Sequence, residues 1–281
     1  MSSKKEMLYN IFMNGPKPSK LYVSNICAYY GKKLVLKSLS VAVETGRLTC
    51  LCGPNGSGKS TLLSVLSGAK EPGLKVVDGI DNQSYMDCTS LDAMELAKLP
   101  RKKAATIVAY MQQNEYSTWN FTAKELVLQG RFCHTANGAY SLGDEQLALD
   151  ALRELGIFNL ADRPVHSLSG GEFQKARIAR ALCQDASFIL LDEPSANLDF
   201  SYEPQFMQML KNLAHSKQKG ILISIHDINL AAAYADDVIL LPLLQQPICG
   251  KMEEILTLEN LKKTYGMEFE CQKVNCFRSL Q

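Results

Sequence analysis

The amino-acid sequence predicts an α/β fold, in which a mainly parallel sheet follows an antiparallel β-subdomain and carries an inserted α-helical subdomain. Three observations predict this arrangement. Residues 20–52 are rich in short β-type runs, strands and helices alternate from position 53, and the stretch from about 114 to 182 shows helical patterns alone.

The β-rich start consists of the runs "KLYVSNICAYY", "LSVAVETG" and "RLTCLC". Each is short and apolar and is bounded by Gly, Lys or Glu, which is typical of strands. Further along, "FILLD" and "ILISIH" are continuous apolar runs of the kind found in strands that a parallel sheet buries on both faces. These runs predict the central strands of the main sheet.

Helical spacing follows in two places. Phe206, Met209, Leu210 and Leu213 recur at i, i+3, i+4 and i+7, which predicts a helix packed on the main sheet. In the helical stretch, Thr122 and Glu125 form a capping-box pattern ahead of "LVLQGR". A second apolar stripe there consists of Ala148, Ala151, Leu152 and Leu155.

Length and composition set the remaining bounds. The 281 residues suffice for one large domain, which we place at 20–242, with an N-terminal arm at 1–19 and a hairpin and helix extension at 243–281. Lys and Arg number 30 against 29 Asp and Glu, so the charge balance gives no reason to expect a nucleic-acid partner. No apolar run approaches the roughly 20 residues of a membrane-spanning helix.

Nine cysteines are present, but no CxxC pair occurs and only four histidines accompany them. Small apolar core positions explain this pattern better than a metal or redox site does. A reducing cytoplasm is therefore the expected compartment, and we find no secretory signal near the N-terminus.

A glycine-rich segment, "GPNGSGKST", follows the third strand and opens an apolar helix. Such a loop can bind polyphosphate through its main-chain amides, with the lysine on the β- and γ-phosphates and the following hydroxyl on Mg²⁺. A Gly-rich turn without function would explain the segment alone, but its position between strand and helix favours a phosphate loop. The residues concerned are Gly53, Pro54, Asn55, Gly56, Ser57, Gly58, Lys59, Ser60 and Thr61.

Two carboxylates end the buried strand in "FILLDEP". The end of a strand is where an open α/β sheet presents its ligand groups. We expect Asp192 to hold Mg²⁺ and Glu193 to orient the water that attacks the γ-phosphate. Adjacent carboxylates alone would indicate a solvated turn, but the phosphate loop makes a nucleotide site the better interpretation.

A second anion cradle is expected at "LSGGE", where Ser169, Gly170, Gly171 and Glu172 open a helix. One nucleotide does not require two cradles in one chain. The simplest explanation is a head-to-tail dimer in which this segment of one subunit closes on the ATP of the other. A serine that merely caps a helix is the alternative.

At this point the chain resembles the ATP-binding subunits of ABC transporters over nearly its whole length. The motifs occur in the family's order: Tyr30, the phosphate loop, Gln113 in "AYMQQ", "LSGGE", "FILLDEP", Asp199 in "SANLD" and His226 in "SIHD". The resemblance implies that Tyr30 stacks on adenine and that Gln113 senses the Mg²⁺ site and the permease. It also implies that Asp199 lies at the dimer seam and that His226 contacts the γ-phosphate.

Finer features resemble the importers of iron-siderophores, haem and cobalamin. The segment "GRFCH", Gly130 to His134, is similar to that group's "GRxPH", and so is the wording of the C-terminal region. Cys133 and Gln112 stand where that group usually has proline, Phe173 replaces a basic residue or tryptophan, and "LPLLQQPICG" lacks the expected Asp-Gly turn.

The resemblance implies several partners and a location. These are integral membrane permease subunits, a second ATP-binding subunit, expected to be an identical copy, and indirectly an external substrate-binding protein. The chain would lie peripherally on the cytoplasmic face of the inner membrane, with ATP and Mg²⁺ bound. Two alternatives stay open: a soluble ABC ATPase that moves no cargo, for example in iron-sulfur assembly, and a manganese or zinc importer ATPase.

Overall fold

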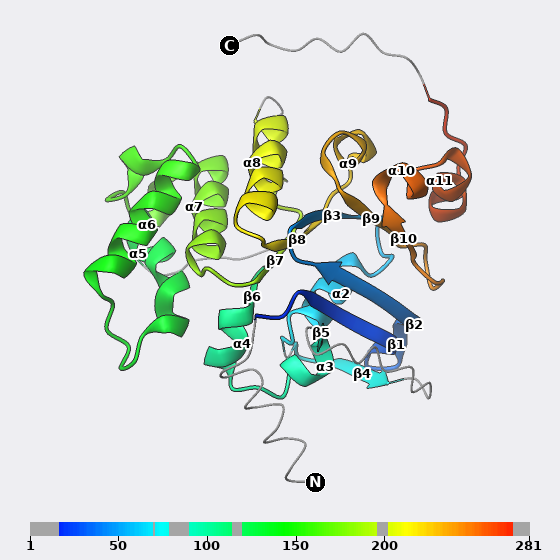
Figure 1. The fold of residues 1–281 in the computed structure, drawn as a ribbon, viewed down its shortest axis with the longest axis horizontal. Coiled ribbons are helices and arrows are strands. Elements are labelled where there is room, and N and C mark those ends of the chain that lie inside the picture. The colour runs from blue at the N-terminus through cyan, green and yellow to red at the C-terminus, as the bar shows by residue number, and fades with distance from the viewer. Residues whose placement is uncertain (1–16, 70, 79–89, 114–119, 196–201, 272–281) are drawn as a thin grey trace.

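The computed structural model describes residues 17–69, 71–78, 90–113, 120–195 and 202–271 (Figure 1). Asp199 and nearly all of the expected N-terminal arm lie outside the described residues. The described residues form two sheets, two groups of helices that cover them and the inserted helical subdomain. The predicted α/β class is therefore confirmed.

The first sheet is the β-subdomain. Strand β1 (Lys20–Tyr30) lies between β2 (Lys33–Glu44) and β4 (Leu74–Asp78) and is antiparallel to both. The short β5 (Ser90–Asp92) adds a parallel pairing to β1 that the sequence did not predict. Buried and partly exposed residues alternate along much of β1, because one face of this sheet packs on the core.

The second sheet has the order β10-β9-β3-β8-β7-β6. Every pairing is parallel except that of β10 with β9. The hairpin of these two strands forms although its connection lacks an Asp-Gly turn. The strands are β3 (Arg47–Cys52), β6 (Val108–Met111), β7 (Phe188–Asp192), β8 (Gly220–Ser224), β9 (Asp237–Leu240) and β10 (Ile248–Lys251).

Two apolar cores lie on opposite faces of the second sheet. Along β7, Phe188 and Leu190 join the core shared with the β-subdomain, whereas Ile189 and Leu191 join the core of the opposite face. Alternate side chains of one strand thus stabilise both layers, which explains why "FILLD" is apolar throughout.

The helices cover these faces as Figure 1 shows. On the β-subdomain side lie α2 (Lys59–Leu66), α3 (Ala93–Leu96) and α4 (Arg101–Ile107). The other side carries α8 (Glu203–Ser216), α9 (Ile228–Tyr234), α10 (Met252–Ile255) and α11 (Leu258–Tyr265). In α8 the predicted stripe is largely confirmed, since Phe206, Leu210 and Leu213 are buried while Met209 is only partly buried.

The inserted subdomain is helical as predicted. It contains α5 (Ala123–Leu128), the 3₁₀ helix η1 (Gln129–His134), α6 (Leu142–Glu154) and α7 (Gly170–Cys183), with two further 3₁₀ turns, η2 (Phe158–Leu160) and η3 (Val165–Ser167). The capping box of Thr122 and Glu125 is present at α5. Two more capping boxes begin α6 and α7, and together they fix where these helices start.

The seven cysteines among the described residues are all free, and Cys50 and Cys52 are buried in β3. The burial of Cys50 and Cys52 agrees with the assignment of these two residues to the apolar core. Within the part of the chain that the structure describes, no helix combines the length and the apolarity needed to cross a membrane.

We predict that Gly130→Ala destabilises the chain by about 1–3 kcal/mol, the usual cost of overpacking. A Cβ at this position would lie 2.4 Å from the Arg180 main-chain oxygen, and a backbone oxygen cannot move aside as a side chain can. Urea denaturation measures the change. Gly143→Ala is the matched control, because its nearest neighbour would be the Ser141 Oγ at 3.6 Å. There we expect a gain of up to about 1 kcal/mol from better helix propensity. Equal stability of both variants would contradict the packing described for η1 against α7.

Candidate functional site

The phosphate loop connects β3 to α2 and has the backbone that its glycines allow. Gly56 and Gly58 have φ angles of 80° and 101°, in the left-handed region that side chains disfavour. A Cβ on Gly58 would also lie 2.5 Å from Leu36 Cδ2. The loop therefore depends on glycine for its conformation as well as for access to its amides.

Lys59 lies beneath this loop and is 6% exposed. Its Nζ donates to the main-chain oxygens of Gly53 at 2.8 Å and Pro54 at 3.3 Å. Burial lowers the pKa of Lys59, while the charge of Glu193 acts in the opposite direction. An anion above the loop would relieve this desolvation by pairing with the ammonium.

Ser57 Oγ is buried and has no hydrogen-bond partner among the described groups. A buried hydroxyl without a partner is costly unless a ligand satisfies it. Together with the main-chain amides at the start of α2 and the nearby ammonium, this oxygen fits a polyphosphate ligand such as the triphosphate of ATP.

Asp192 and Glu193 lie at the end of β7. The Asp192 side chain is 1% exposed and its Oδ1 accepts a hydrogen bond from Ser224 Oγ at 2.7 Å. Burial raises the pKa of Asp192, while hydrogen bonds from Ser224 and Ser60 act in the opposite direction. The same Ser224 Oγ accepts from the main-chain N–H of Glu193 at 2.8 Å.

Glu193 is bonded to two other predicted residues, Gln113 and His226. One of its oxygens accepts from Gln113 Nε2 at 2.5 Å, and the other lies 2.7 Å from His226 Nε2. Glu193 also has φ 46°, an unusual value for a residue with a side chain. Because these residues follow the adjacent parallel strands β6, β7 and β8, their side chains meet at one edge of the sheet.

The residues expected to bind Mg²⁺ are partly assembled. Ser60 faces Asp192, and Gln113 is bonded to Glu193. No cluster of three or more His, Cys, Asp or Glu side chains suited to a metal occurs among the described residues. A single carboxylate with a hydroxyl nevertheless fits Mg²⁺, which keeps several waters and takes its other ligands from substrate phosphates.

The segment "LSGGE" begins α7. Ser169 is its N-cap, and Glu172 accepts from the Ser169 main-chain N–H at 2.8 Å, which lowers the pKa of that carboxyl. Ser169 and Gly170 are exposed, whereas Gly171 is partly buried. No described hydrogen bond or ion pair joins these residues to the phosphate loop of the same chain, so the structure does not bring these two predicted anion sites into contact.

Two residues further along α7 were missed in the sequence. Arg177 donates to the main-chain oxygens of Gln112 and Gln113, and Gln174 Nε2 donates to the Pro194 oxygen at 2.8 Å. Both side chains are almost fully buried. They tie α7 to the segments that carry Gln113 and Glu193. The sequence contains no local pattern for these contacts, because their partners are 20 or more positions away.

Tyr30 is the last residue of β1. Its hydroxyl donates to Glu71 Oε2, and burial together with this carboxylate raises the pKa of Tyr30 to about 12. The side chain of Thr61 faces the same hydroxyl. Glu71 did not stand out in the sequence, because it belongs to no motif.

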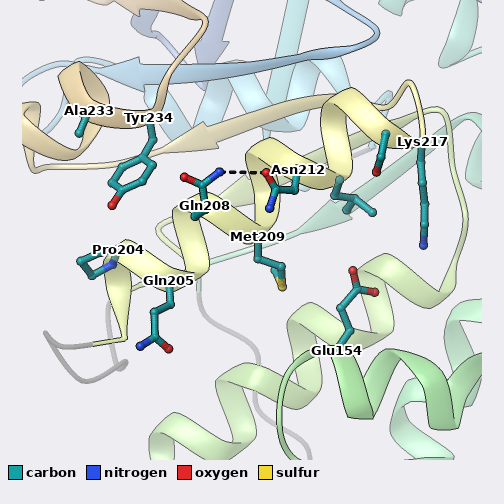
Figure 2. A pocket seen from close by; sticks show the side chains of 11 residues that line it. Glu154, Pro204, Gln205, Gln208, Met209, Asn212, Lys217, Ala233 and Tyr234 are labelled. Atoms are coloured by element: carbon teal, nitrogen blue, oxygen red, sulfur yellow. Dashed lines mark hydrogen bonds between the residues drawn. The ribbon is translucent and has the colours of Figure 1, made fainter. Parts of the chain in front are cut away.

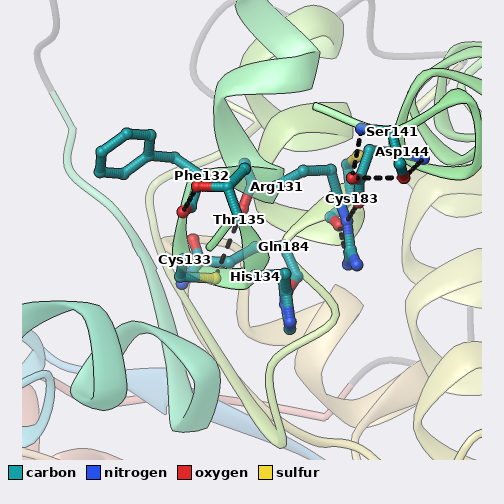
Figure 3. A network of polar contacts seen from close by, with 10 residues as sticks. Arg131, Phe132, Cys133, His134, Thr135, Ser141, Asp144, Cys183 and Gln184 are labelled. Carbon is teal, nitrogen blue, oxygen red and sulfur yellow. Dashed lines mark hydrogen bonds and ion pairs between the residues drawn. The ribbon is translucent and has the colours of Figure 1, made fainter. Parts of the chain in front are cut away.

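The segment "GRFCH" lies in η1 and bonds it to the two helices α6 and α7, as Figure 3 shows. Arg131 Nε donates to Asp144 of α6 at 2.8 Å, and its Nη1 donates to the Cys183 oxygen of α7 at 3.1 Å. His134 Nε2 lies 2.8 Å from the Gln184 oxygen. The motif residues of this segment therefore hold the insert together and do not contact the phosphate loop in the described structure.

A groove of about 700 Å³ lies elsewhere, between α8, α9 and the end of α6. Figure 2 shows Gln205, Gln208 and Met209 of α8 on one side and Glu154 of α6 on the other. No motif residue lines this groove, so it is separate from the candidate nucleotide site.

Comparisons with known proteins agree with these motifs. The family model described as "ABC transporter" matches residues 36–196. The petrobactin import ATP-binding protein YclP of Bacillus subtilis is 32% identical over 253 residues, covering 90% of this chain and 95% of that protein. The ferric enterobactin transport ATP-binding protein FepC of Escherichia coli is 34% identical over 241 residues, covering 85% and 84%. The manganese transport system ATP-binding protein MntB of Bacillus subtilis is 34% identical over 252 residues, covering 87% and 91%.

Two solved structures are similar in fold. An inward-facing metal-chelate type ABC transporter matches with a TM-score of 0.70 and 28% identity over 89% of this chain and 90% of that one. A bacterial ABC transporter cassette solved as a dimer matches with a TM-score of 0.64 and 28% identity over 82% and 98%.

We predict that Asp144→Asn lowers the free energy of unfolding by on the order of 3 kcal/mol at pH 7, because it leaves the mostly buried Arg131 without its anion. Arg131 holds the pKa of Asp144 below its ordinary value, so this stabilisation exists above the unfolded-state pKa and is lost as the pH falls through the folded one. The difference between variant and parent should therefore shrink below about pH 4.

Asp150→Asn is the matched control on the same helix. Its partner Arg153 is exposed, so we expect a change below about 0.5 kcal/mol. Urea denaturation at several pH values measures both variants. A loss in Asp144→Asn that stayed constant down to pH 3 would exclude the ion pair as its cause.

Proposed function

This chain belongs to the ABC transporter family, and from that premise we propose that it is the ATP-hydrolysing subunit of an importer for an iron-siderophore, haem or cobalamin-type cargo. ABC ATP-binding proteins are ATPases coupled to transport. The ATPase assignment rests on one observation. The side chains of Gln113 and His226 are both bonded to that of Glu193, beside Asp192 and the phosphate loop. The names of its relatives, which import petrobactin and ferric enterobactin, support the cargo class.

The residues then divide the work of phosphoryl transfer, which requires positioning and charge stabilisation more than covalent chemistry. The loop amides and Lys59 hold the phosphates. Glu193 orients the attacking water and accepts its proton, while Gln113 and His226 keep the Glu193 carboxylate in place. Ser60, Gln113 and Asp192 would hold Mg²⁺, which neutralises charge on the phosphates when bound.

Dimerisation completes the site in this proposal. Ser169, Gly170, Gly171 and Glu172 of one subunit would close on the nucleotide of a second, identical subunit, and Asp199 would lie at the seam. The exposure of Ser169 and Gly170 supports a role toward another chain. The similar cassette that was solved as a dimer supports the same arrangement. Hydrolysis would then depend on closure of the dimer.

The proposed partners beyond the second subunit are integral membrane permease subunits, which the helical insert contacts, and indirectly an external substrate-binding protein. The chain would be a peripheral protein on the cytoplasmic face of the inner membrane. Its opening and closing would switch the permease between inward and outward access.

A second cargo class has a specific observation in its favour. MntB, a manganese transport ATP-binding protein, is as similar to this chain as the siderophore transporters are. A manganese or zinc importer would use the same nucleotide chemistry and differ only in the permease and its binding protein. A soluble ABC ATPase of iron-sulfur assembly is less supported, because the relatives named above serve transport.

We predict that Glu193→Gln leaves ATP binding intact and lowers the ATPase rate by at least about 100-fold, within the usual range for a general base. The glutamine keeps the size of the side chain and can still bond Gln113, but it cannot accept the water's proton. Phosphate release measures turnover, and calorimetry measures binding.

Two further variants serve as controls for the Glu193→Gln measurement. Lys59→Ala should weaken ATP binding itself, and unchanged affinity would argue against the phosphate-loop assignment. Glu254→Gln, in the exposed α10, should behave as the parent. A turnover near the parental value in Glu193→Gln would remove Glu193 from its proposed role.

The transport proposal is tested with tagged Glu193→Gln protein, which should hold ATP in the closed dimer. After incubation with ATP in detergent-solubilised membranes, the bound proteins are identified by mass spectrometry. A polytopic membrane protein in equal amount is the expected result, and binding assays on its partner protein would identify the cargo. Recovery of soluble proteins alone would reject the importer while leaving the ATPase chemistry intact.

A further inference from the structure

The Tyr30 hydroxyl is held from two sides. It donates to Glu71 Oε2, and the Thr61 side chain faces the same oxygen. These two residues belong to different parts of the chain, since Glu71 precedes β4 and Thr61 lies in the first turn of α2. A phenol whose oxygen is held by two elements cannot swing about χ1, and so move its ring away, without losing a hydrogen bond.

The backbone near this contact is also fixed. Tyr30 pairs with Leu74 at the start of β4, and the Gly31 main-chain N–H donates to the Gly73 oxygen at 3.3 Å. The turn itself is closed by a bond from the Leu74 N–H to the Glu71 oxygen at 3.2 Å. The Glu71 side chain is therefore attached to an ordered turn that leads directly into β4, the strand that pairs with Tyr30.

Thr61 connects this arrangement to the phosphate loop. It directly follows Ser60 and is 7% exposed, so it cannot move independently of the loop. The position of the Tyr30 ring is consequently fixed relative to the phosphate site. A nucleotide whose base stacks on the Tyr30 ring and whose phosphates occupy the loop must span the distance between ring and loop. That distance is therefore set before the nucleotide binds.

We propose that Glu71 is a positioning residue for the nucleotide base: by binding the Tyr30 hydroxyl it keeps the Tyr30 side chain in the position from which its ring stacks on adenine. The inference rests on the proposed function, in which Tyr30 contacts adenine. Glu71 touches no part of the nucleotide in this scheme and acts only through Tyr30.

The expected effect is one of pre-organisation. Without Glu71 the Tyr30 side chain must be ordered when ATP binds, which should weaken ATP binding about 2- to 10-fold, the cost of immobilising one side chain. Tripolyphosphate has no base, so its binding should not depend on the ring. The diagnostic quantity is the ratio of the two affinities, because any charge effect of Glu71 on the phosphates cancels in it.

The experiment measures binding of ATP and of tripolyphosphate to the full chain by calorimetry. Glu71→Ala should reduce the ratio of ATP to tripolyphosphate affinity 2- to 10-fold, and Tyr30→Phe, which also loses the contact with Thr61, should reduce it at least as much. The double variant should lose no more than Tyr30→Phe alone, because the Glu71 carboxylate acts only through the hydroxyl that this substitution removes. Glu71→Gln keeps an acceptor oxygen and should restore most of the parental ratio.

The controls separate this inference from the proposed function. Glu95→Ala removes a glutamate whose only described ion pair is with the exposed Lys98, and it should leave the ratio unchanged. Tyr30→Ala must lower the ratio if the ring stacks on adenine at all, and an unchanged ratio there would reject the proposed role of Tyr30. A lowered ratio in Tyr30→Ala with a parental ratio in Glu71→Ala would overturn the positioning role of Glu71 alone. An equal loss of ATP and tripolyphosphate binding in Glu71→Ala would likewise overturn it, since a structural defect has no preference for the base.

Discussion

The parallel register of β7 and β8 is the constraint on which the candidate site depends. It pairs Asp192 with Ser224, so that one hydroxyl donates to the Asp192 carboxylate and accepts from the Glu193 amide. This double contact fixes the direction in which the chain leaves β7, and it supports the left-handed conformation of Glu193. Gln113 and His226 then reach the Glu193 carboxylate from the two neighbouring strands. A shift of one residue in this register would separate all of these groups.

The charges of Lys59 and of the carboxylates at the end of β7 lie near one another, but no described ion pair joins them. Burial acts against the charged forms of both Lys59 and Asp192, lowering the pKa of the first and raising that of the second. Lys59 bonds main-chain oxygens of its own loop instead of a carboxylate. An anion accompanied by a divalent cation would therefore offset the desolvation of the lysine and of the carboxylates together.

The features that the sequence could predict are those whose residues lie close together along the chain. The phosphate loop and the capping boxes lie within a few consecutive residues, and the sequence was sufficient for them because their geometry is local. The family's motif order brought Gln113, Glu193 and His226 to attention, but not the bonds between them. Ser224, Arg177 and Glu71 could not be found, because each acts on a residue more than 30 positions away and belongs to no local pattern. The β9–β10 hairpin formed without the turn residues that usually mark it, since pairing along the sheet edge determines it.

The helix that begins in the "LSGGE" segment also holds the main chain of the candidate site in place. Its first residues face outward, while Gln174 and Arg177, one to two turns further, bond Pro194 and the main chain of Gln112 and Gln113. A force applied at the start of α7 by a second subunit would therefore reach the segments around Gln113 and Glu193 through a rigid helix and two buried side chains. At its other end, α7 is bonded to η1 through Arg131 and the Cys183 oxygen. In the proposed dimer, α7 would therefore connect the surface that meets the second subunit with the segments around Gln113 and Glu193 and with η1.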